Sequence, residues 1–173
     1  TTGVNVDQEF IRRIAVNRPG GKGGAARSFE SLAELAPGAQ NDQYGVCING
    51  ATWPENGYVV DGLSTNDPAF GINASPLSIE FVQDVNVVTG GYLPEFGRST
   101  GGVINAVTRS GTNDFEFGSE IVWEPNFLQA HKTDRPGILG RYDEYDRQNY
   151  NVYASGPIIQ DKLFFFALYE FRD

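Results

Sequence analysis

The sequence has little of several residue types, and each shortage excludes a class of site. Methionine is absent, and 173 residues include one cysteine and one histidine. Cys47 has no second cysteine to pair with, so we expect a small buried apolar residue rather than a disulfide. His131 stands in a polar stretch without other ligand-type residues at ligand spacing. The sequence therefore predicts neither a metal site nor a cofactor.

Positive charge and long apolar runs are also scarce. The 13 Lys and Arg residues are outnumbered by 22 Asp and Glu residues, which gives a net charge of −9. Nucleic acid is therefore excluded as the main partner, because phosphate binding needs a basic face. No apolar run approaches the ~18 residues of a membrane-spanning helix. The first residues do not form a secretory signal, and we expect Thr1 not to be the natural start of the protein.

No catalytic constellation is present, so we predict that the protein is not an enzyme. The single histidine is far along the chain from most serines, and no carboxylate pair is set among apolar residues that would raise one pKa. The glycines at 20–24 lack a following Ser or Thr and a preceding strand, so a linker is expected instead of a phosphate loop. The acidic residues at 143–146 are expected to form a solvated loop rather than a cation site.

Glycine is abundant, with 21 residues, and the stretch Val85–Thr108 uses it most distinctively. Two β-branched runs flank a glycine-rich middle, which predicts two strands joined by a tightly folded connection. Tyr92 and Phe96 are expected to be core anchors of this connection.

Short helices and strands are predicted before this stretch. Asp7 can cap a helix through Ile14 with Phe10 and Ile11 on its apolar face. The other predicted helices are Ser28-capped Phe29–Ala36 and Leu77–Phe81, and the predicted strands are Val46–Ile48 and Gly57–Val60.

After residue 113 the apolar pattern changes to a period of two. Three strands are predicted, within Phe115–Glu124, Asn149–Ser155 and Leu163–Arg172, joined by a long polar connection, Pro125–Tyr145, and a short turn, Gly156–Lys162. Such strands are typical of a transmembrane β-barrel. A soluble antiparallel meander with one solvated face has the same periodicity, so the pattern leaves both open.

The order of these pieces, from about Val4 to Asp173, resembles the plug domain of TonB-dependent outer-membrane receptors followed by the first strands of their barrel. The motifs that carry this resemblance are Leu32–Gly38, Ile48–Ala51, Tyr58–Gly62, Val85–Gly91, Phe96–Gly97 and Gly101–Thr108. Two stretches, Thr89–Asn113 and Gly156–Phe166, are most similar to the Oar-like branch of the family.

The resemblance implies a fold class and a function. An α+β plug domain (a small mixed sheet with short helices) is expected over 1–112, followed over 113–173 by antiparallel strands, the first three of a transmembrane β-barrel. The implied function is active transport across the outer membrane, with a plug that gates the barrel lumen and TonB acting through a segment upstream of Thr1. Expected partners are outer-membrane lipid and a substrate, possibly a peptide or protein. The alternative is a soluble or secreted binding module with an α+β half and a β-meander half.

The resemblance also places three substrate-facing plug loops, at Gln40–Gln43, Thr52–Asn56 and Leu63–Phe70. The residues expected there are Gln40, Asn41, Trp53, Asn56, Asn66, Asp67 and Phe70. Polar turns that only fill the lumen are the simpler interpretation of the same loops.

In the barrel strands, Phe115, Phe117, Ile121 and Trp123 are expected to face lipid and Glu116, Glu120 and Glu124 the lumen, with interfacial aromatics at Trp123, Tyr145, Tyr169 and Phe171. Family charges that latch plug to barrel are replaced here by Asn49, Asp84 and Asn86.

Overall fold

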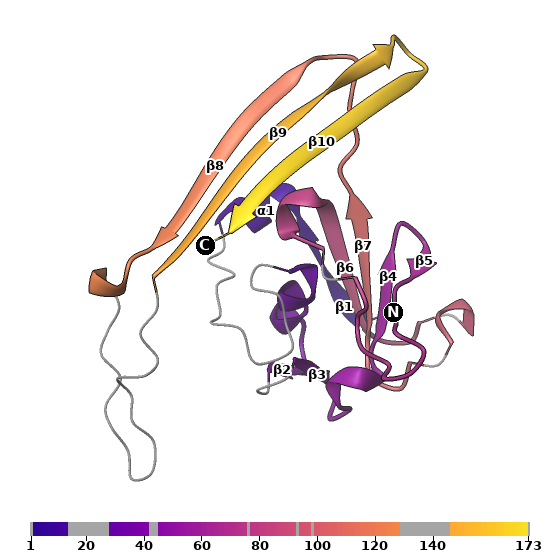
Figure 1. Cartoon of the computed structure of the whole chain (residues 1–173). Helices are drawn as coiled ribbons and strands as arrows, with labels where there is room; N and C mark the ends of the chain where they lie inside the picture. Colours follow the sequence, from indigo (N-terminus) through magenta and orange to yellow (C-terminus); the bar gives the residue numbers. More distant parts are fainter. Residues whose placement is uncertain are drawn as a thin grey trace. The chain divides into compact units, whose positions relative to one another are not determined.

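The structure is a computed structural model that describes residues 2–13, 28–41, 45–75, 77–92, 94–97, 99–128 and 146–172. The chain divides into two compact units, Thr1–Arg109 and Ser110–Asp173 (Figure 1). Ile14, the glycines at 20–24, His131, Asp143, Glu144 and Tyr145 lie outside the described residues.

A five-stranded sheet forms the frame of the first unit. Its strands, in spatial order, are β1 (Thr2–Asp7), β6 (Val82–Gly90), β7 (Val103–Thr108), β4 (Gly57–Val60) and β5 (Leu63–Ser64). The β4–β7 pair is parallel and the other pairs are antiparallel, so the sheet is mixed as predicted. The stretch 85–108 provides the adjacent strands β6 and β7, and the short 3-10 helix η4 (Pro94–Phe96) lies in their connection.

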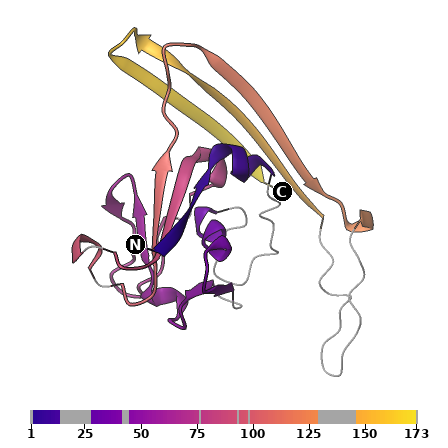
Figure 2. The same ribbon diagram turned by 180° about the vertical axis from the view of Figure 1, so that it is seen from behind.

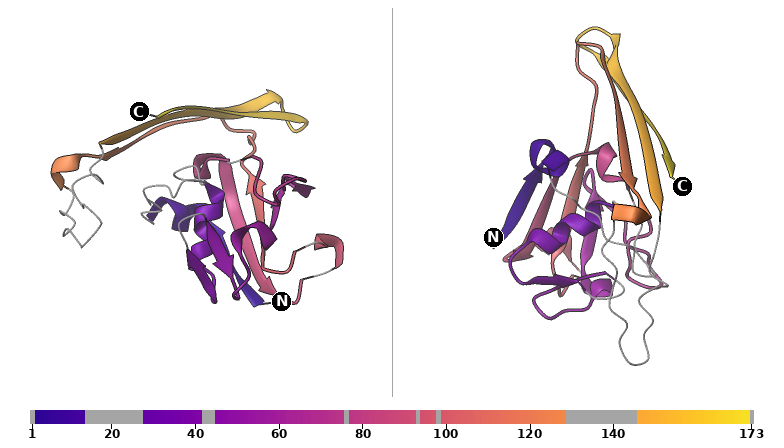
Figure 3. Two further views of the ribbon diagram at one scale, coloured as in Figure 1. Left: turned by 60° about the horizontal axis from the view of Figure 1, so that its bottom comes forward. Right: turned by 90° about the vertical axis from the view of Figure 1, so that its left-hand side faces the viewer.

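One face of this sheet carries the hydrophobic core. Alternate residues of β6 and β7, including Val85, Val87, Ile104 and Ala106, are fully buried there. The 3-10 helix η1 (Phe29–Leu35) lies against this face (Figure 3) and adds Phe29, Leu32 and Ala33 to the core. The hairpin of β2 (Ala39–Asn41) and β3 (Val46–Ile48) contributes Ile48.

The helices differ from the prediction in type and in exposed face. The segment after Ser28 is a 3-10 helix, and Ser28 makes no side-chain cap hydrogen bond. The N–H of Ser31 donates to the Ser28 carbonyl at 3.0 Å and that of Ala36 to the Ala33 carbonyl at 3.1 Å, which is the three-residue spacing of a 3-10 helix. Leu35, predicted on the apolar face, is 41% exposed at the last position of η1, although the three-residue turn aligns it with Phe29 and Leu32.

Two more predicted helices are corrected. The first is α1 (Gln8–Arg13), which Asp7 caps by accepting a hydrogen bond from the N–H of Phe10 at 2.8 Å. Ile11 is buried as predicted, but Phe10 is 48% exposed. One turn on a sheet edge has room to bury a single large side chain. The segment Leu77–Phe81 is a shorter 3-10 helix, η3 (Ile79–Phe81), whose first turn is capped by Ser78. The strands β1, β2 and β5 were not predicted.

The second unit is a three-stranded antiparallel sheet in the order β10-β9-β8 (Figure 2). Its strands are β8 (Glu116–Glu124), β9 (Arg147–Ile159) and β10 (Leu163–Arg172), and the 3-10 turn η5 (Asn126–Leu128) follows β8. The predicted turn from Gly156 was too long, because β9 continues to Ile159. Beyond Ser155 only β10 pairs with β9, so Pro157, which has no N–H, is tolerated in the strand.

Among the described residues no helix is long and apolar enough to cross a membrane.

Candidate functional site

Two of the three predicted loops, 52–56 and 63–70, meet at Asn56, whose side chain is buried. Its Nδ2 donates to the carbonyl oxygen of Val46 at 2.6 Å, and its Oδ1 accepts from the N–H of Gly102 at 3.1 Å. The side chain is 1% exposed. One amide therefore connects the start of β3 with the start of β7, although these segments are far apart in the sequence.

The loop that contains Asn66 joins the same end. Asn66 Oδ1 accepts from the N–H of Tyr58 at 2.8 Å, and Nδ2 donates to the carbonyls of Asn56 at 2.9 Å and Gly71 at 3.0 Å. Gly71, with φ 73°, approaches the Pro54 carbonyl so closely that a Cβ would clash with it. The third predicted loop is thus fixed against the second.

Glu55 ties these loops to the segment 99–102. Its Oε2 accepts from Thr52 N at 2.6 Å, and its Oε1 accepts from Thr100 Oγ1 at 3.1 Å. These hydrogen bonds, led by the one from the Thr52 N–H, lower the pKa of Glu55 because they favour the carboxylate. The carbonyl of Glu55 also accepts from the N–H groups of Thr100 and Gly101.

The seven side chains predicted to meet substrate fall into three groups: those that bind backbone groups, those that are exposed and those that are half-buried. Asn56, Asn66 and Asp67 are engaged in holding backbone, and Asp67 Oδ1 accepts from the N–H groups of Ala69 and Phe70 at 2.7 and 3.0 Å. The outward-facing residues are Phe70, which is 72% exposed, and Gln40. Trp53 and Asn41 are half-buried. Contact of these residues with a substrate stays a prediction.

The two aromatic anchors of the 91–102 connection lie outside the hydrophobic core, contrary to the prediction. Tyr92 is half-buried and its hydroxyl donates to the Ser99 carbonyl at 2.7 Å, so it holds the loop instead. Phe96 lines a cavity of about 360 Å³ on the face of the sheet opposite the core. Both rings come from the connection between β6 and β7, outside the strands whose alternate residues face the core.

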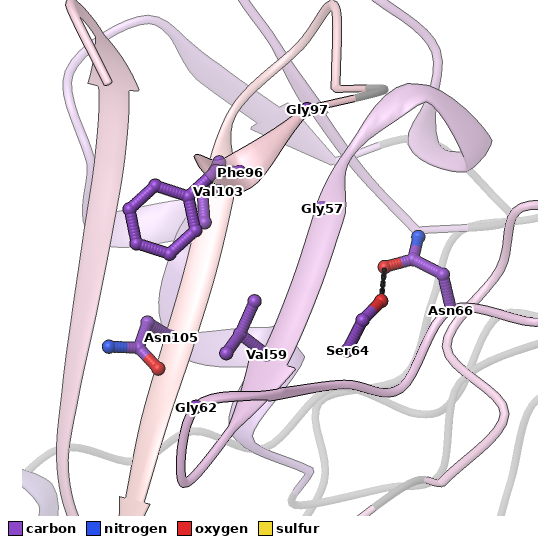
Figure 4. A pocket seen from close by; sticks show the side chains of 9 residues that line it. All are labelled: Gly57, Val59, Gly62, Ser64, Asn66, Phe96, Gly97, Val103 and Asn105. Carbon is purple, nitrogen blue, oxygen red and sulfur yellow. Dashed lines mark hydrogen bonds between the residues drawn. The ribbon is translucent and has the colours of Figure 1, made fainter. Parts of the chain in front are cut away.

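That cavity also contains a group that sequence reasoning missed (Figure 4). Its walls include Val59 and Val103, and Asn105 lies beside them with a buried Oδ1 that has no hydrogen-bond partner in the structure. The only signal in the sequence is one polar residue inside the apolar run of β7.

The latch position Asn49 has a different role here. It adopts a left-handed conformation, with φ 54°, and its Nδ2 donates to the carbonyl of Thr89 at 2.6 Å. Asn tolerates this conformation better than most residues. Asn49 therefore bonds β3 to β6 within the first unit.

The described residues contain no group of three metal-ligating side chains. The described loops at the Asn56 end offer hydrogen-bonding groups and an exposed aromatic ring, an arrangement that suits binding.

The sheet of the second unit has one exposed apolar face. Its exposed side chains include Phe117 (76%), Ile121 (66%), Trp123 (56%), Val152 (56%), Tyr169 (71%) and Phe171 (52%). Residues of the opposite face, Asn149, Asn151 and Ser155, are at most 3% exposed, and Asn149 Nδ2 donates to Glu170 Oε1 at 2.8 Å. A soluble meander would bury its apolar side and expose its polar side. The second unit instead exposes its apolar side.

Comparison with known proteins connects these features to one group of receptors. No family model matches the chain. The TonB-dependent transporter Oar of Myxococcus xanthus is 67% identical over 171 residues, which is 96% of this chain and 16% of Oar. The chain therefore spans less than two thirds of the length of that relative.

Solved structures match the fold. The siderophore receptor PirA from Acinetobacter baumannii has a TM-score of 0.68 at 14% identity, and the match covers 98% of this chain and 24% of the PirA chain. PirA from Pseudomonas aeruginosa has a TM-score of 0.66 at 22% identity, with 98% and 27% coverage. The outer-membrane transporter YddB from Escherichia coli has a TM-score of 0.68 at 20% identity, with 98% and 26% coverage.

The resemblance predicted from the motifs is therefore confirmed. The sequence match is to an Oar transporter, and the fold, a plug-like mixed sheet followed by antiparallel strands, is that of the receptor structures. The relatives are named as transporters and receptors rather than enzymes, in agreement with the prediction that this protein is not an enzyme.

Proposed function

Given a chain that is similar to TonB-dependent outer-membrane receptors in sequence and in fold, we propose that it is the plug and the first three barrel strands of an active outer-membrane transporter. The plug covers 1–112 and the strands 113–173. The plug closes the lumen of the barrel, and TonB acts on it through a segment upstream of Thr1. The compact units Thr1–Arg109 and Ser110–Asp173 support this division.

The observation that carries the proposal is the exposed apolar face of the β8–β9–β10 sheet. Barrel walls alternate lipid-facing apolar residues with lumen-facing polar ones. The four residues predicted to face lipid are all exposed, with Phe115 63% exposed beside Phe117, Ile121 and Trp123. Glu116 and Glu120 alternate with them and share a face with Asn151 and Glu170. In this topology the connection after β8 is extracellular and the turn Gln160–Lys162 is periplasmic, because external loops are the long ones.

For the plug, we propose that the Asn56 end meets the substrate. Gln40, Asn41, Trp53 and Phe70 supply contact surface, and the hydrogen bonds of Asn56, Asn66 and Asp67 hold the loops in place. A peptide or protein substrate suits an exposed aromatic ring among amide groups. In this proposal the plug works by moving rather than by catalysing a reaction.

Fractionation of the full-length protein tests the proposal against the soluble binding module. We expect the protein in the outer-membrane fraction, with the faster electrophoretic migration before heating that folded barrels show. A full-length protein found in the soluble periplasmic fraction, with migration unchanged by heating, would favour the binding module.

A further inference from the structure

The cavity lined by Phe96 lies on the face of the five-stranded sheet that carries no hydrophobic core. One cross-strand row forms its middle, because Asn105 of β7 pairs with Val59 of β4, and Val59 pairs with Ser64 of β5. Figure 4 shows Val59 between the other two side chains. The volume of about 360 Å³ is at the small end of the range for ligand pockets. The cavity therefore has room for one ring system rather than for a large ligand.

The walls of this cavity are apolar, with one acceptor among them. Val59 is 8% exposed and Val103 is 1% exposed, and Phe96 is half-buried. The Oδ1 atom of Asn105 is buried and has no hydrogen-bond partner in the part of the chain that the structure describes. A buried acceptor without a partner is unfavourable. A ligand that brings an N–H or O–H to Asn105 would supply the missing hydrogen bond.

The chemistry of the lining residues narrows the class of ligand. None of the nine described lining residues carries a charge. A lysine or arginine side chain would lose its hydration there without a carboxylate to pair with. An aliphatic side chain would fill the space but leave the Asn105 oxygen unpaired. A neutral aromatic ring with one donor satisfies both conditions, and tryptophan and tyrosine carry such rings.

Asn66 connects the cavity with the loops at the Asn56 end. It lines the cavity, and its amide accepts from the N–H of Tyr58 at 2.8 Å and donates to the carbonyl of Asn56 at 2.9 Å. A peptide that contacts these loops can therefore place one side chain in the cavity beside them.

We propose that the cavity is a pocket for a tryptophan or tyrosine side chain of a peptide or protein substrate. The Oδ1 atom of Asn105 accepts a hydrogen bond from the indole N–H or the phenol O–H, and the ring lies against Phe96 and Val59. The inference rests on the proposed function, since the adjoining Asn56 end is assigned there to the substrate.

Binding of blocked amino acids to the full-length protein in phospholipid nanodiscs tests the pocket, with empty nanodiscs as the reference in equilibrium dialysis. N-acetyltryptophanamide is compared with its 1-methylindole analogue, which lacks the N–H, and N-acetyltyrosinamide with its O-methyl ether. We expect the donor-bearing member of each pair to bind at least about fivefold more tightly, because only that member pairs the buried oxygen. This comparison uses the unchanged protein, so it does not depend on the folding of a variant.

Two variants then locate the effect. In Asn105→Val we expect the two members of each pair to bind equally. Asn86→Val is the matched control, because Asn86 pairs with Asn105 across β6 and β7, is exposed and is not among the lining residues. The preference for the donor-bearing member should persist in this control. Heat-modifiable migration shows that both variants are folded.

The outcomes separate the two proposals. Equal binding of the donor-bearing and methylated compounds to the unchanged protein, or no saturable binding of either, would overturn the pocket. A preference that persists in Asn105→Val would also overturn it. None of these results changes the fractionation of the full-length protein, whose presence in the soluble periplasmic fraction would instead contradict the proposed function.

Discussion

The amide oxygen of Asn56 accepts a hydrogen bond from the backbone N–H of Gly102 at 3.1 Å, across 46 positions of sequence. The same side chain donates to Val46 at 2.6 Å. Because both bonds are buried, they fix the loop end of the first unit to the central strand β7. The proposed substrate-facing loops are therefore mechanically connected to the sheet on which TonB would act.

Replacing Asn56 with Leu should loosen this end. The change leaves a buried carbonyl and a buried N–H unsatisfied, which costs about 2–4 kcal/mol in unfolding free energy. Hydrogen exchange of β4 and β7 amides in the full-length protein should accelerate by about 30-fold or more where exchange follows unfolding of the unit. Asn86→Leu, on an exposed position of β6, is the control and should change exchange little. Equal effects of the two changes would refute the role of Asn56.

Gly102→Val should misfold or unseat the plug while the barrel strands still insert. A Cβ at Gly102 would meet Ile48 and lie 3.1 Å from the Val88 carbonyl. Overpacking of this kind costs about 1–3 kcal/mol. Gly90→Val is the matched control, since nothing lies within 4 Å of a Cβ there. The readout is transport together with heat-modifiable migration, and normal transport by Gly102→Val would contradict the packing argument.

Asp61 should hold the end of β7 through its carboxylate. Its two oxygens accept from Thr108 N at 2.9 Å and Thr108 Oγ1 at 2.7 Å, and its φ of 49° is left-handed. Asp61→Ala loses both bonds and tolerates this φ poorly, so a loss of about 1–2 kcal/mol is expected. Asp61→Asn keeps one hydrogen-bond acceptor and tolerates the left-handed conformation, so it should lose less unfolding free energy. Protection of the Thr108 amide from exchange measures the difference, and equal losses would argue against the hydrogen bonds.

Glu30 should make the stability of the first unit depend on pH. Burial raises its pKa above the ordinary 4.5, and a hydrogen bond from Asn73 Nδ2 at 2.7 Å offsets part of this. Because the pKa of Glu30 is higher in the folded state, its contribution to the free energy of unfolding is favourable below pH 4.5. That contribution is lost as the pH rises through the folded-state pKa. Glu30→Gln keeps an acceptor for Asn73, so it should stabilise the unit at pH 7 and not at pH 4. The free energy of unfolding of Glu30→Gln and of the unchanged protein is compared at pH 4 and pH 7. A stabilisation by Glu30→Gln that is the same at both pH values would contradict the burial argument.

The strands that could be predicted are those whose pattern is local. The β-branched residues of β6 and β7 and the period of two in β8 and β9 indicate strands without any knowledge of partners. The strand β2 could not be found this way. Two of its three residues, Gln40 and Asn41, are polar, and it is a strand because it pairs with β3.

The roles of site residues were harder to predict than their location. The sequence placed Asn56 and Asn66 in loops, where amides are expected to be free for a ligand. The structure commits both amides to backbone groups, and the partner of Asn56 at Gly102 lies 46 positions away. Long-range closure of this kind leaves no local signal, which is also why the buried oxygen of Asn105 was missed.

The central claim is that the first unit plugs a barrel, and single-channel conductance tests it most directly. The full-length protein and a variant that lacks residues 1–112 are compared in planar lipid bilayers, after heat-modifiable migration shows that both barrels are folded. We predict a closed full-length protein and a large, steady open channel in the deletion variant. Equal conductance of the two proteins would contradict the claim.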